Sequence, residues 1–269
     1  MSTLYMQKSV TDTICLSLIF QDAGELVVFD GGFDSEGENL AAKLNELGGR
    51  VKYWVLTHPH DDHMGAFCHV LEHHPEITVE AACYHFLPYE LICQHTHGDP
   101  NSLAMIPRIA PLCQARGVQI ITPCAGDAFA VGGAALYCLR QPDPALTQDQ
   151  INNSSTIWRI DANGKRVLIL GDLGKQAGEQ AAAAIPAAEL KSDYVQMAHH
   201  GQNGAEKPLY EIIDPDYCIW CTPSWLWDNM GENGYDTGPF KTVITRGWMS
   251  ELGIKRHYVD KDGPFAIEL

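Results

Sequence analysis

A short polar stretch holds the residues best suited to chemistry. Residues 57–63 read Thr-His-Pro-His-Asp-Asp-His, so three histidines and two aspartates fall within six positions. They follow the apolar, β-rich run 51–56, which predicts a strand that ends where the polar residues begin. Imidazoles suit zinc, iron or manganese, and a carboxylate can complete or bridge a second metal site. Because crowding five such side chains without a cation would be costly, we interpret the stretch as a metal site.

Three further predicted strands end at polar residues of the same kind. They are strand 25–29 before Asp30, strand 165–170 before Asp172, and strand 193–198 before His199 and His200. Functional sites of α/β proteins tend to lie at the carboxyl ends of strands. We therefore expect these side chains to meet the 57–63 stretch at one rim of the sheet.

Length and composition indicate an ordinary globular chain. The 269 residues are 45% hydrophobic and are interpreted as one domain, 1–269, with an insertion at about 83–112. No run approaches the roughly 18 apolar residues of a membrane span. The N-terminus lacks a basic segment followed by an apolar core, so we expect a cytoplasmic protein. Its nine cysteines are then expected to be reduced and mostly buried.

The charge balance bears on the partners. There are 18 basic and 34 acidic residues, a formal net charge of −16. This argues against a broad electrostatic grip on long nucleic acids, and no membrane contact is expected. It does not exclude phosphate chemistry in a cleft where metals supply the positive charge. The expected partner is a small-molecule substrate, and the oligomeric state stays open.

Two pairs of residues have spacings typical of metal sites but are interpreted as ordinary surface or core residues. His69 and His73 are four residues apart on the predicted helix 65–74, but no acid is placed as in the zincin motif, so both are interpreted as solvated helix residues. Cys218 and Cys221 form C-x-x-C on a predicted strand, where residues three apart face opposite sides. Without a second pair, both are interpreted as core thiols.

The motif His58-x-His60-x-Asp62-His63 resembles the signature of the metallo-β-lactamase-fold superfamily. The resemblance covers about Ser17 to Leu269. It implies an α/β fold, a four-layered αβ/βα sandwich of two mixed, mostly antiparallel sheets with outer helices. Four stretches look closest to the branch of the competence-type DNA-uptake hydrolase domain and of phosphorylcholine esterase domains. They are 152–155, 171–173, 199–201 and 262–267.

The resemblance also implies two metal sites that share one carboxylate. The ligands carried over by position are His58 and His60 for the first metal, Asp62, His63 and His199 for the second, and Asp172 for both. His199 is preferred to His200 because it follows the strand directly, although a register error of one is easy. His200 would then donate a proton to the leaving group. Asp30 would orient a ligand histidine from behind.

One expected ligand is missing. Many members of the superfamily add a third histidine to the first site, shortly before the motif that ends at Asp172, where this chain has asparagines and serines. The first metal is therefore expected to be weakly bound, completed by water, or held by a histidine of the insertion. The insertion offers His85, His95 and His97, although four prolines are expected to break it up. Possible substrate contacts are Asn153, Ser154 and Ser155.

The leading hypothesis is a metal-dependent hydrolase that uses a metal-bridging hydroxide on a phosphodiester-type small molecule. Asp62 and His200 are its predicted catalytic residues. Two divalent metal ions are expected, zinc first, with manganese or iron as alternatives. One alternative is hydrolysis of a carbon ester, lactone, thioester or β-lactam. Another, suggested by the missing histidine, is a non-catalytic metal-binding or sensing domain.

Overall fold

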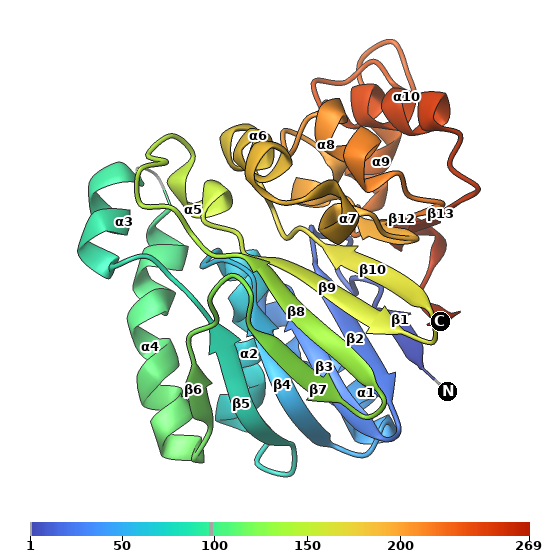
Figure 1. The fold of residues 1–269 in the computed structure, drawn as a ribbon. Coiled ribbons are helices and arrows are strands. Elements are labelled where there is room, and N and C mark those ends of the chain that lie inside the picture. The colour runs from blue at the N-terminus through green and yellow to red at the C-terminus, as the bar shows by residue number, and fades with distance from the viewer. Residues whose placement is uncertain (1, 97–98) are drawn as a thin grey trace.

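Two β-sheets packed face to face organise the chain (Figure 1). The structure is a computed structural model that describes residues 2–96 and 99–269. The first sheet contains, in spatial order, β14 (Phe265–Glu268), β1 (Thr3–Met6), β2 (Ser17–Asp22), β3 (Glu25–Asp30), β4 (Arg50–Leu56), β5 (Thr78–Tyr84) and β6 (Gln119–Ile121). The second contains β13 (Arg256–Val259), β12 (Tyr217–Trp220), β11 (Tyr194–Gln196), β10 (Lys165–Ile169), β9 (Ile157–Ala162), β8 (Ala134–Arg140) and β7 (Ala128–Val131).

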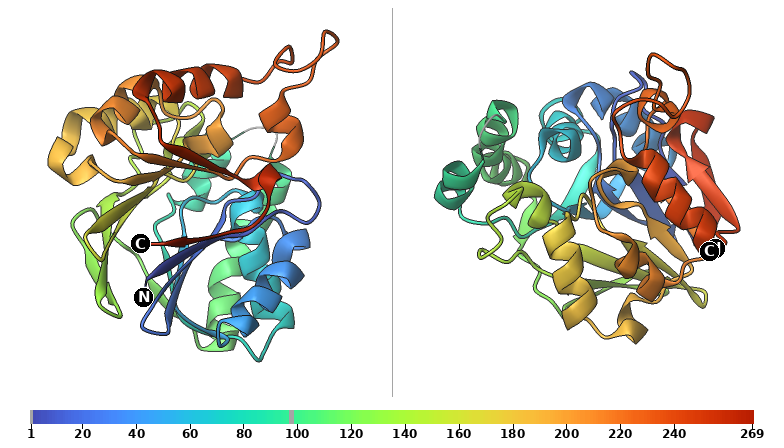
Figure 2. Two further views of the ribbon diagram at one scale, coloured as in Figure 1. Left: turned by 90° about the vertical axis from the view of Figure 1, so that its right-hand side faces the viewer. Right: turned by 90° about the horizontal axis from the view of Figure 1, so that it is seen from above.

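Helices cover the outer faces of both sheets (Figures 1 and 2). The first sheet is covered by α1 (Gly37–Glu46), α2 (Asp61–His73) and α4 (Pro100–Arg116). The second is covered by α6 (Lys175–Ala184), α7 (Ala187–Leu190), α8 (Lys207–Ile213) and α10 (Thr242–Leu252). Shorter elements are η1 (Asp34–Glu36), α3 (Tyr89–His95), α5 (Gln150–Asn153), η2 (Ala198–Gly201), α9 (Ser224–Asp228) and η3 (Asp260–Asp262). The predicted four-layered αβ/βα sandwich, two mixed sheets with outer helices, is confirmed.

The strands alternate between two hydrophobic layers. In β3, Val27 and Phe29 pack between the sheets, whereas Leu26 and Val28 pack against the helices over the first sheet. This is the period of two that places successive side chains on opposite faces. Because both faces are covered, the strand reads as a continuous apolar run, and the polar Asp30 stands out at its end.

The expectation of mostly antiparallel sheets is wrong. Among the described residues, each sheet has three antiparallel and three parallel neighbour pairs. The parallel pairs arise where a helix carries the chain back to the start of the next strand, as α1 does between β3 and β4. These crossovers bring the carboxyl ends of neighbouring strands to one edge, which gathers the polar residues.

The insertion forms two helices, α3 and α4. Helix α4 begins at Pro100, after Asp99 accepts a hydrogen bond from the backbone N–H of Ser102, and runs through Pro107 and Pro111. The expectation that these prolines break the segment is therefore wrong. A proline inside a helix costs about 3 kcal/mol. Packing of α4 on α2, which buries residues such as Ile109, offsets that cost.

The prediction that the cysteines are mostly buried is confirmed. All nine cysteines are free, and seven are buried. Cys218 packs under the outer helices and Cys221 packs between the sheets, so the two thiols face opposite sides. Among the helices of the described part of the chain, none is both long and apolar enough to cross a membrane.

Asp260 makes the stability depend on pH. The side chain is buried beside β13 and accepts a hydrogen bond from the backbone N–H of Ser9 at 3.0 Å, and burial raises its pKa to about 7. In the unfolded chain the carboxyl group titrates near pH ~4. The native state therefore loses stability as pH rises from about 4 to about 7, by an amount on the order of a few kcal/mol.

We expect Asp260→Asn to remove this loss, because the amide oxygen can still accept from Ser9. The thermal unfolding midpoint of the variant should exceed that of the wild type at pH 8, and by less at pH 5. The control is Asp262→Asn, an exposed carboxyl in the same turn, which should leave the thermal unfolding midpoint unchanged at both pH values. An equal effect of Asp260→Asn at both pH values would contradict the assignment.

Candidate metal centre

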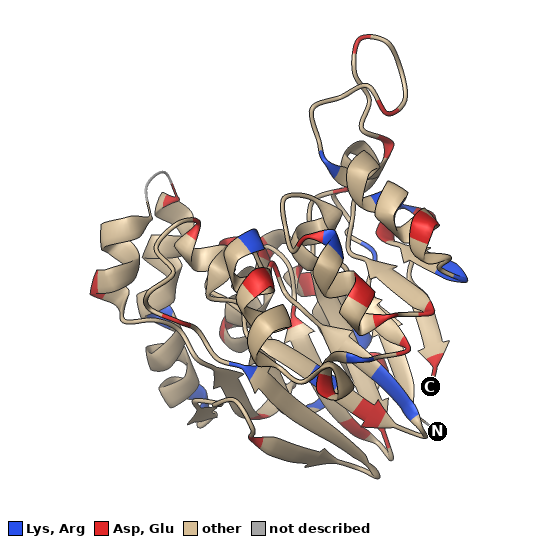
Figure 3. Ribbon diagram, turned by 45° about the horizontal axis from the view of Figure 1, so that its top comes forward, with Lys and Arg blue, Asp and Glu red and all other residues tan. Residues whose placement is uncertain are grey.

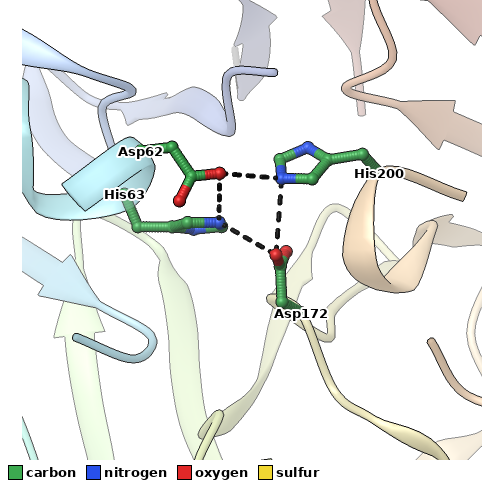
Figure 4. A group of neighbouring side chains, drawn as sticks. All are labelled: Asp62, His63, Asp172 and His200. Atoms are coloured by element: carbon green, nitrogen blue, oxygen red, sulfur yellow. Dashed lines mark hydrogen bonds and ion pairs between the residues drawn. The ribbon is translucent and has the colours of Figure 1, made fainter. Parts of the chain in front are cut away.

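Four segments deliver the candidate ligands to one point between the sheets. His58 and His60 lie in the loop after β4, and Asp172 follows β10. Figure 4 shows Asp62 and His63 on α2 and His200 on η2 pointing toward Asp172. Helix α2 begins at Asp61, four residues before the predicted helix, so its first turn presents Asp62 and His63.

Asp172 occupies the centre of this arrangement. Its Oδ2 lies 3.2 Å from His63 Nε2, 3.4 Å from His200 Nε2 and 3.9 Å from His58 Nε2. Asp62 Oδ2 lies 3.2 Å from His200 Nε2. The donor atoms form two groups that share Asp172: Asp62, His63, Asp172 and His200, and His58, His60 and Asp172.

The donor set fits divalent cations. Zinc bonds of 2.0–2.1 Å in a tetrahedral site place neighbouring ligand atoms about 3.3 Å apart, and His58 Nε2 lies 3.0 Å from His60 Nδ1. His63 Nε2 and Asp172 Oδ1 are buried without a hydrogen-bond partner. A cation would satisfy both atoms, so the residues form a His/Asp metal-binding cluster. Imidazole and carboxylate donors also suit iron and manganese, so they do not select one metal.

Asp30 holds two of the histidines in place. Its Oδ2 accepts from His63 Nδ1 and from the Thr57 hydroxyl, both at 2.7 Å, and its Oδ1 accepts from the backbone N–H of Thr57. Thr57 Oγ1 in turn lies 3.0 Å from His58 Nδ1. Protons on both Nδ1 atoms leave each Nε2 free to face Asp172. The contact predicted for Asp30 is present, whereas sequence reasoning missed Thr57.

The turn after β11 decides which histidine points inward. His199 and His200 both have positive φ angles, 52° and 55°. His200 Nδ1 donates to the backbone carbonyl of Cys221 at 2.9 Å, so its Nε2 faces Asp62 and Asp172. The side chain of His199 is 19% exposed, with Nε2 3.9 Å from Asp172 Oδ2.

The geometry therefore favours His200 over the predicted His199 as the ligand. It does not favour the predicted proton-donor role of His200, because Nε2 faces Asp62 and Asp172 and Nδ1 is bonded to Cys221. The strand ends at Gln196, and His199 and His200 beyond it have left-handed backbone. Strand alternation therefore does not predict which of the two side chains points toward Asp172.

The predicted substrate contacts point into the protein. Asn153 Oδ1 accepts from the backbone N–H of Ala177, and Ser154 Oγ donates to the carbonyl of Ile151. Ser155 Oγ accepts from the backbone N–H of Asp172 at 3.2 Å. All three side chains are buried, so the structure contradicts a direct substrate role for Asn153, Ser154 and Ser155. Asn153 ends the short helix α5 and the two serines follow it, so all three polar groups bond to neighbouring backbone.

The described residues of the insertion bring a carboxylate, and no imidazole, to the first group. His85 Nδ1 donates to the carbonyl of Pro123, and His95 lines a cavity beside His60 without joining the group. His97 lies outside the described residues. Asp99 Oδ2 lies 3.5 Å from His60 Nε2, the ring nitrogen that faces away from His58. Among the described residues, the first group therefore has two histidines and Asp172, with Asp99 behind His60.

Burial and charge shift the pKa values of the histidines in opposite directions. Burial and the neighbouring His63 hold the pKa of His58 well below its usual value. Burial also opposes the charge of His63, but Asp172, Asp62 and Asp30 outweigh it and raise that pKa well above normal. Against burial, Asp172 and Asp62 raise the pKa of His200 to about 10. Metal binding must displace such protons, so metal affinity is expected to rise with pH.

We expect Asp30→Asn to weaken metal binding by about 10–100-fold, the usual effect of losing a partner that orients a ligand histidine. An amide has one acceptor oxygen for the three donors that Asp30 now satisfies. Zinc titration against a chromophoric chelator measures the change. The control is Asp262→Asn, the exposed carboxyl beside Asp260, which should leave metal affinity unchanged. Wild-type affinity in Asp30→Asn would contradict the orienting role.

Comparison with known proteins agrees with this geometry. Residues 10–88 match the sequence model of the Metallo-beta-lactamase superfamily. The metallo-beta-lactamase fold protein YhfI from Bacillus subtilis superposes over 100% of both chains, with a TM-score of 0.60 and 11% identity. Igni18, a metallo hydrolase from the hyperthermophilic archaeon Ignicoccus hospitalis, superposes over 100% of both chains, with a TM-score of 0.54 and 11% identity.

A third similar structure is larger. CmlA, a diiron beta-hydroxylase from Streptomyces venezuelae, matches 100% of this chain, with a TM-score of 0.56 and 12% identity. The chain spans 54% of the length of CmlA. No curated protein matches the sequence. The matches over the whole chain show that it has the metallo-beta-lactamase fold, and the sequence of residues 10–88 is similar to that superfamily.

Proposed function

We propose that the chain is a dinuclear metal-dependent hydrolase whose preferred substrates are small phosphodiesters. The observation that carries the proposal is the position of Asp172 Oδ2, within 3.9 Å of imidazole nitrogens from His58, His63 and His200. One carboxylate oxygen between two groups of nitrogen donors is the arrangement expected of a ligand that two cations share.

The residues divide into two ligand sets. His58, His60 and Asp172 would hold one cation, and Asp62, His63, His200 and Asp172 the other. When bound, the two cations would activate the attacking water and polarise the scissile group. His199 lies beside Asp172 but outside both sets, and its Nδ1 is buried without a partner. Because its side chain is 19% exposed, His199 can bind a substrate oxygen or pass a proton to the leaving group.

The cavity beside the first group supports a small substrate. Its volume is about 360 Å³, within the usual size of small-molecule sites. The described residues that line it are His60, His95, Thr96, Asp99, Asp149, Gln150 and Ile151. Two of them are acidic and none is Lys or Arg. The Gln150 amide is buried without a hydrogen-bond partner and could bind a polar substrate group.

The charge distribution favours a small molecule over long nucleic acid. The net charge is −16, and in the view of Figure 3 Lys and Arg positions are scattered among Asp and Glu positions. A nucleic-acid groove requires clustered basic residues along the backbone path. We therefore take the resemblance to the competence-type branch as support for cleavage of a phosphodiester bond, and not for binding of a long nucleic acid. Binding of single-stranded DNA that disappears with added salt would contradict this ranking.

The second candidate is hydrolysis of a carbon ester, lactone, thioester or β-lactam. Two cations polarise a carbonyl as readily as a phosphoryl group. The absence of Lys and Arg among the described cavity-lining residues favours this candidate, because a neutral carbonyl substrate needs no cationic side chain. The third candidate is a non-catalytic metal-binding domain, favoured by the two-histidine first group.

One set of assays separates the three candidates. Metal-free protein is reconstituted with zinc or manganese and supplied with a chromogenic phosphodiester, a lactone and a thioester. We expect phosphodiester turnover that Asp172→Asn abolishes. Turnover of carbonyl substrates alone would replace the leading proposal with the second. No turnover, with one metal or none at the Asp172 cluster, would favour the non-catalytic domain.

A further inference from the structure

A second group of metal-capable side chains lies away from the Asp172 cluster. It consists of Glu38 in the first turn of α1, His69 on α2, and His74, which caps the end of α2. Glu38 Oε1 lies 3.2 Å from His69 Nε2 and 3.4 Å from His74 Nε2. One donor atom from each residue lies within 4.8 Å of the other two. Tetrahedral zinc ligands are separated by about 3.3 Å, so the spacing suits a single ion.

Each histidine also faces a carboxylate with its other ring nitrogen. His69 Nδ1 lies 3.4 Å from Asp34 Oδ1, and His74 Nδ1 lies 2.9 Å from Glu76 Oε1. A neutral imidazole carries one proton and can satisfy only one of its two carboxylate neighbours. The other nitrogen then faces a carboxylate lone pair. Accordingly, His69 Nδ1 and His74 Nε2 are buried without a hydrogen-bond partner.

A cation bound by the Nε2 atoms of His69 and His74 would remove both unfavourable contacts between a ring nitrogen and a carboxylate. Protons then reside on the two Nδ1 atoms and point to Asp34 and Glu76, the arrangement usual for metal-binding histidines. Three carboxylates around two imidazoles leave a negative charge that a divalent cation offsets.

The histidine rings are held in position. The side chains of His69 and His74 are 14% and 15% exposed, whereas that of His73 is 57% exposed. A Cβ atom on Gly37 would come within 2.4 Å of the His69 ring, so the glycine makes room for it. The interpretation of His69 and His73 as solvated is therefore right for His73 and wrong for His69. Because α2 ends at His73, the chain turns and brings His74 to His69.

We propose that Glu38, His69 and His74 bind one divalent transition-metal ion, zinc or a neighbour such as cobalt or nickel. The Glu38 side chain is 74% exposed, so the remaining coordination position is open to water. The ion would tie the start of α1 to the end of α2. The first turn of α2 carries Asp62 and His63, so the ion stabilises the helix that presents them without contacting the Asp172 cluster.

The test counts zinc ions bound by metal-free protein after equilibrium dialysis. Glu38→Gln and His74→Ala should each bind one equivalent fewer than the wild type. The matched control, His73→Ala, changes an exposed histidine on the same helix and should bind the wild-type number. Zinc should also raise the thermal unfolding midpoint of Asp172→Asn, and this rise should disappear in Asp172→Asn combined with Glu38→Gln. Glu38 is exposed, so Glu38→Gln is expected to fold.

The same measurements can overturn the proposal. Wild-type stoichiometry in both Glu38→Gln and His74→Ala would show that the group is a set of ion pairs with protonated histidines. An equal loss in His73→Ala would indicate non-specific surface binding. Because the midpoint comparison is made in the Asp172→Asn background, neither result depends on whether the proposed hydrolase activity is found.

Discussion

Asp172→Asn is expected to lower hydrolytic activity by at least about 10³-fold, because the cation-mediated stabilisation of the transition state is worth several kcal/mol. Among the described residues, Asp172 is the residue common to both ligand groups. An asparagine keeps the shape but replaces the shared anion with a neutral amide. Both metal equivalents of the cluster should bind more weakly, so activity and metal content should fall together.

Steady-state kinetics and zinc content of the purified variant measure these two losses. The control is Asp127→Asn, an exposed aspartate whose carboxylate accepts a hydrogen bond from the backbone N–H of Cys124 in its own turn. It should retain wild-type activity and metal content. Near-normal activity in Asp172→Asn would mean that the reaction does not use this cluster. Normal metal content with lost activity would mean that Asp172 acts on the substrate, not as a shared ligand.

His200→Ala and His199→Ala are expected to differ in metal content. His200 Nε2 lies within 3.4 Å of both Asp62 and Asp172, so its removal should release one metal equivalent and lower activity about 10³-fold. His199 lies outside both ligand groups. Its removal should keep the metal and lower kcat by about 10²-fold or more if it passes a proton.

Metal content therefore separates the two histidines even where both variants lose activity. Elemental analysis after dialysis gives the content, and the pH profile of kcat tests the proton-passing role of His199. The opposite result, metal loss in His199→Ala and retention in His200→Ala, would restore the choice made from the sequence. It would require the turn at residues 198–201 to rearrange when metal binds.

The sequence predicts the fold and the meeting of the ligands because both depend on local signals. Apolar runs that end at Asp30, at His58 and at Asp172 mark buried strands, and strand ends converge wherever crossovers are parallel. The same argument does not give the number of parallel pairs. That number depends on which strands become neighbours, a property of the whole chain.

The choice between His199 and His200 could not be made from the sequence because two consecutive non-glycine residues adopt positive φ. Such backbone is uncommon, and tertiary contacts hold it: His200 bonds to the carbonyl of Cys221, and Thr222 Oγ1 donates to the carbonyl of His200. Asn153 was misread for a related reason. Its amide bonds to Ala177 and Gln148, partners that only the folded chain brings near.

Contacts between distant segments were also beyond the sequence. Asp99 reaches His60 only because α4 packs along α2. His74 reaches Glu38 only because α1 and α2 lie side by side. Neither pair has a spacing along the chain that indicates a contact. In both cases the helices over the first sheet supply the missing information.

Anomalous diffraction from zinc-loaded crystals tests the central claim most directly. We expect two peaks that share Asp172, one bounded by His58 and His60, the other by Asp62, His63 and His200. A single peak would reduce the cluster to one metal and remove the proposed sharing. The absence of any peak within coordination distance of Asp172 would contradict the account of this protein as a dinuclear metal-dependent hydrolase.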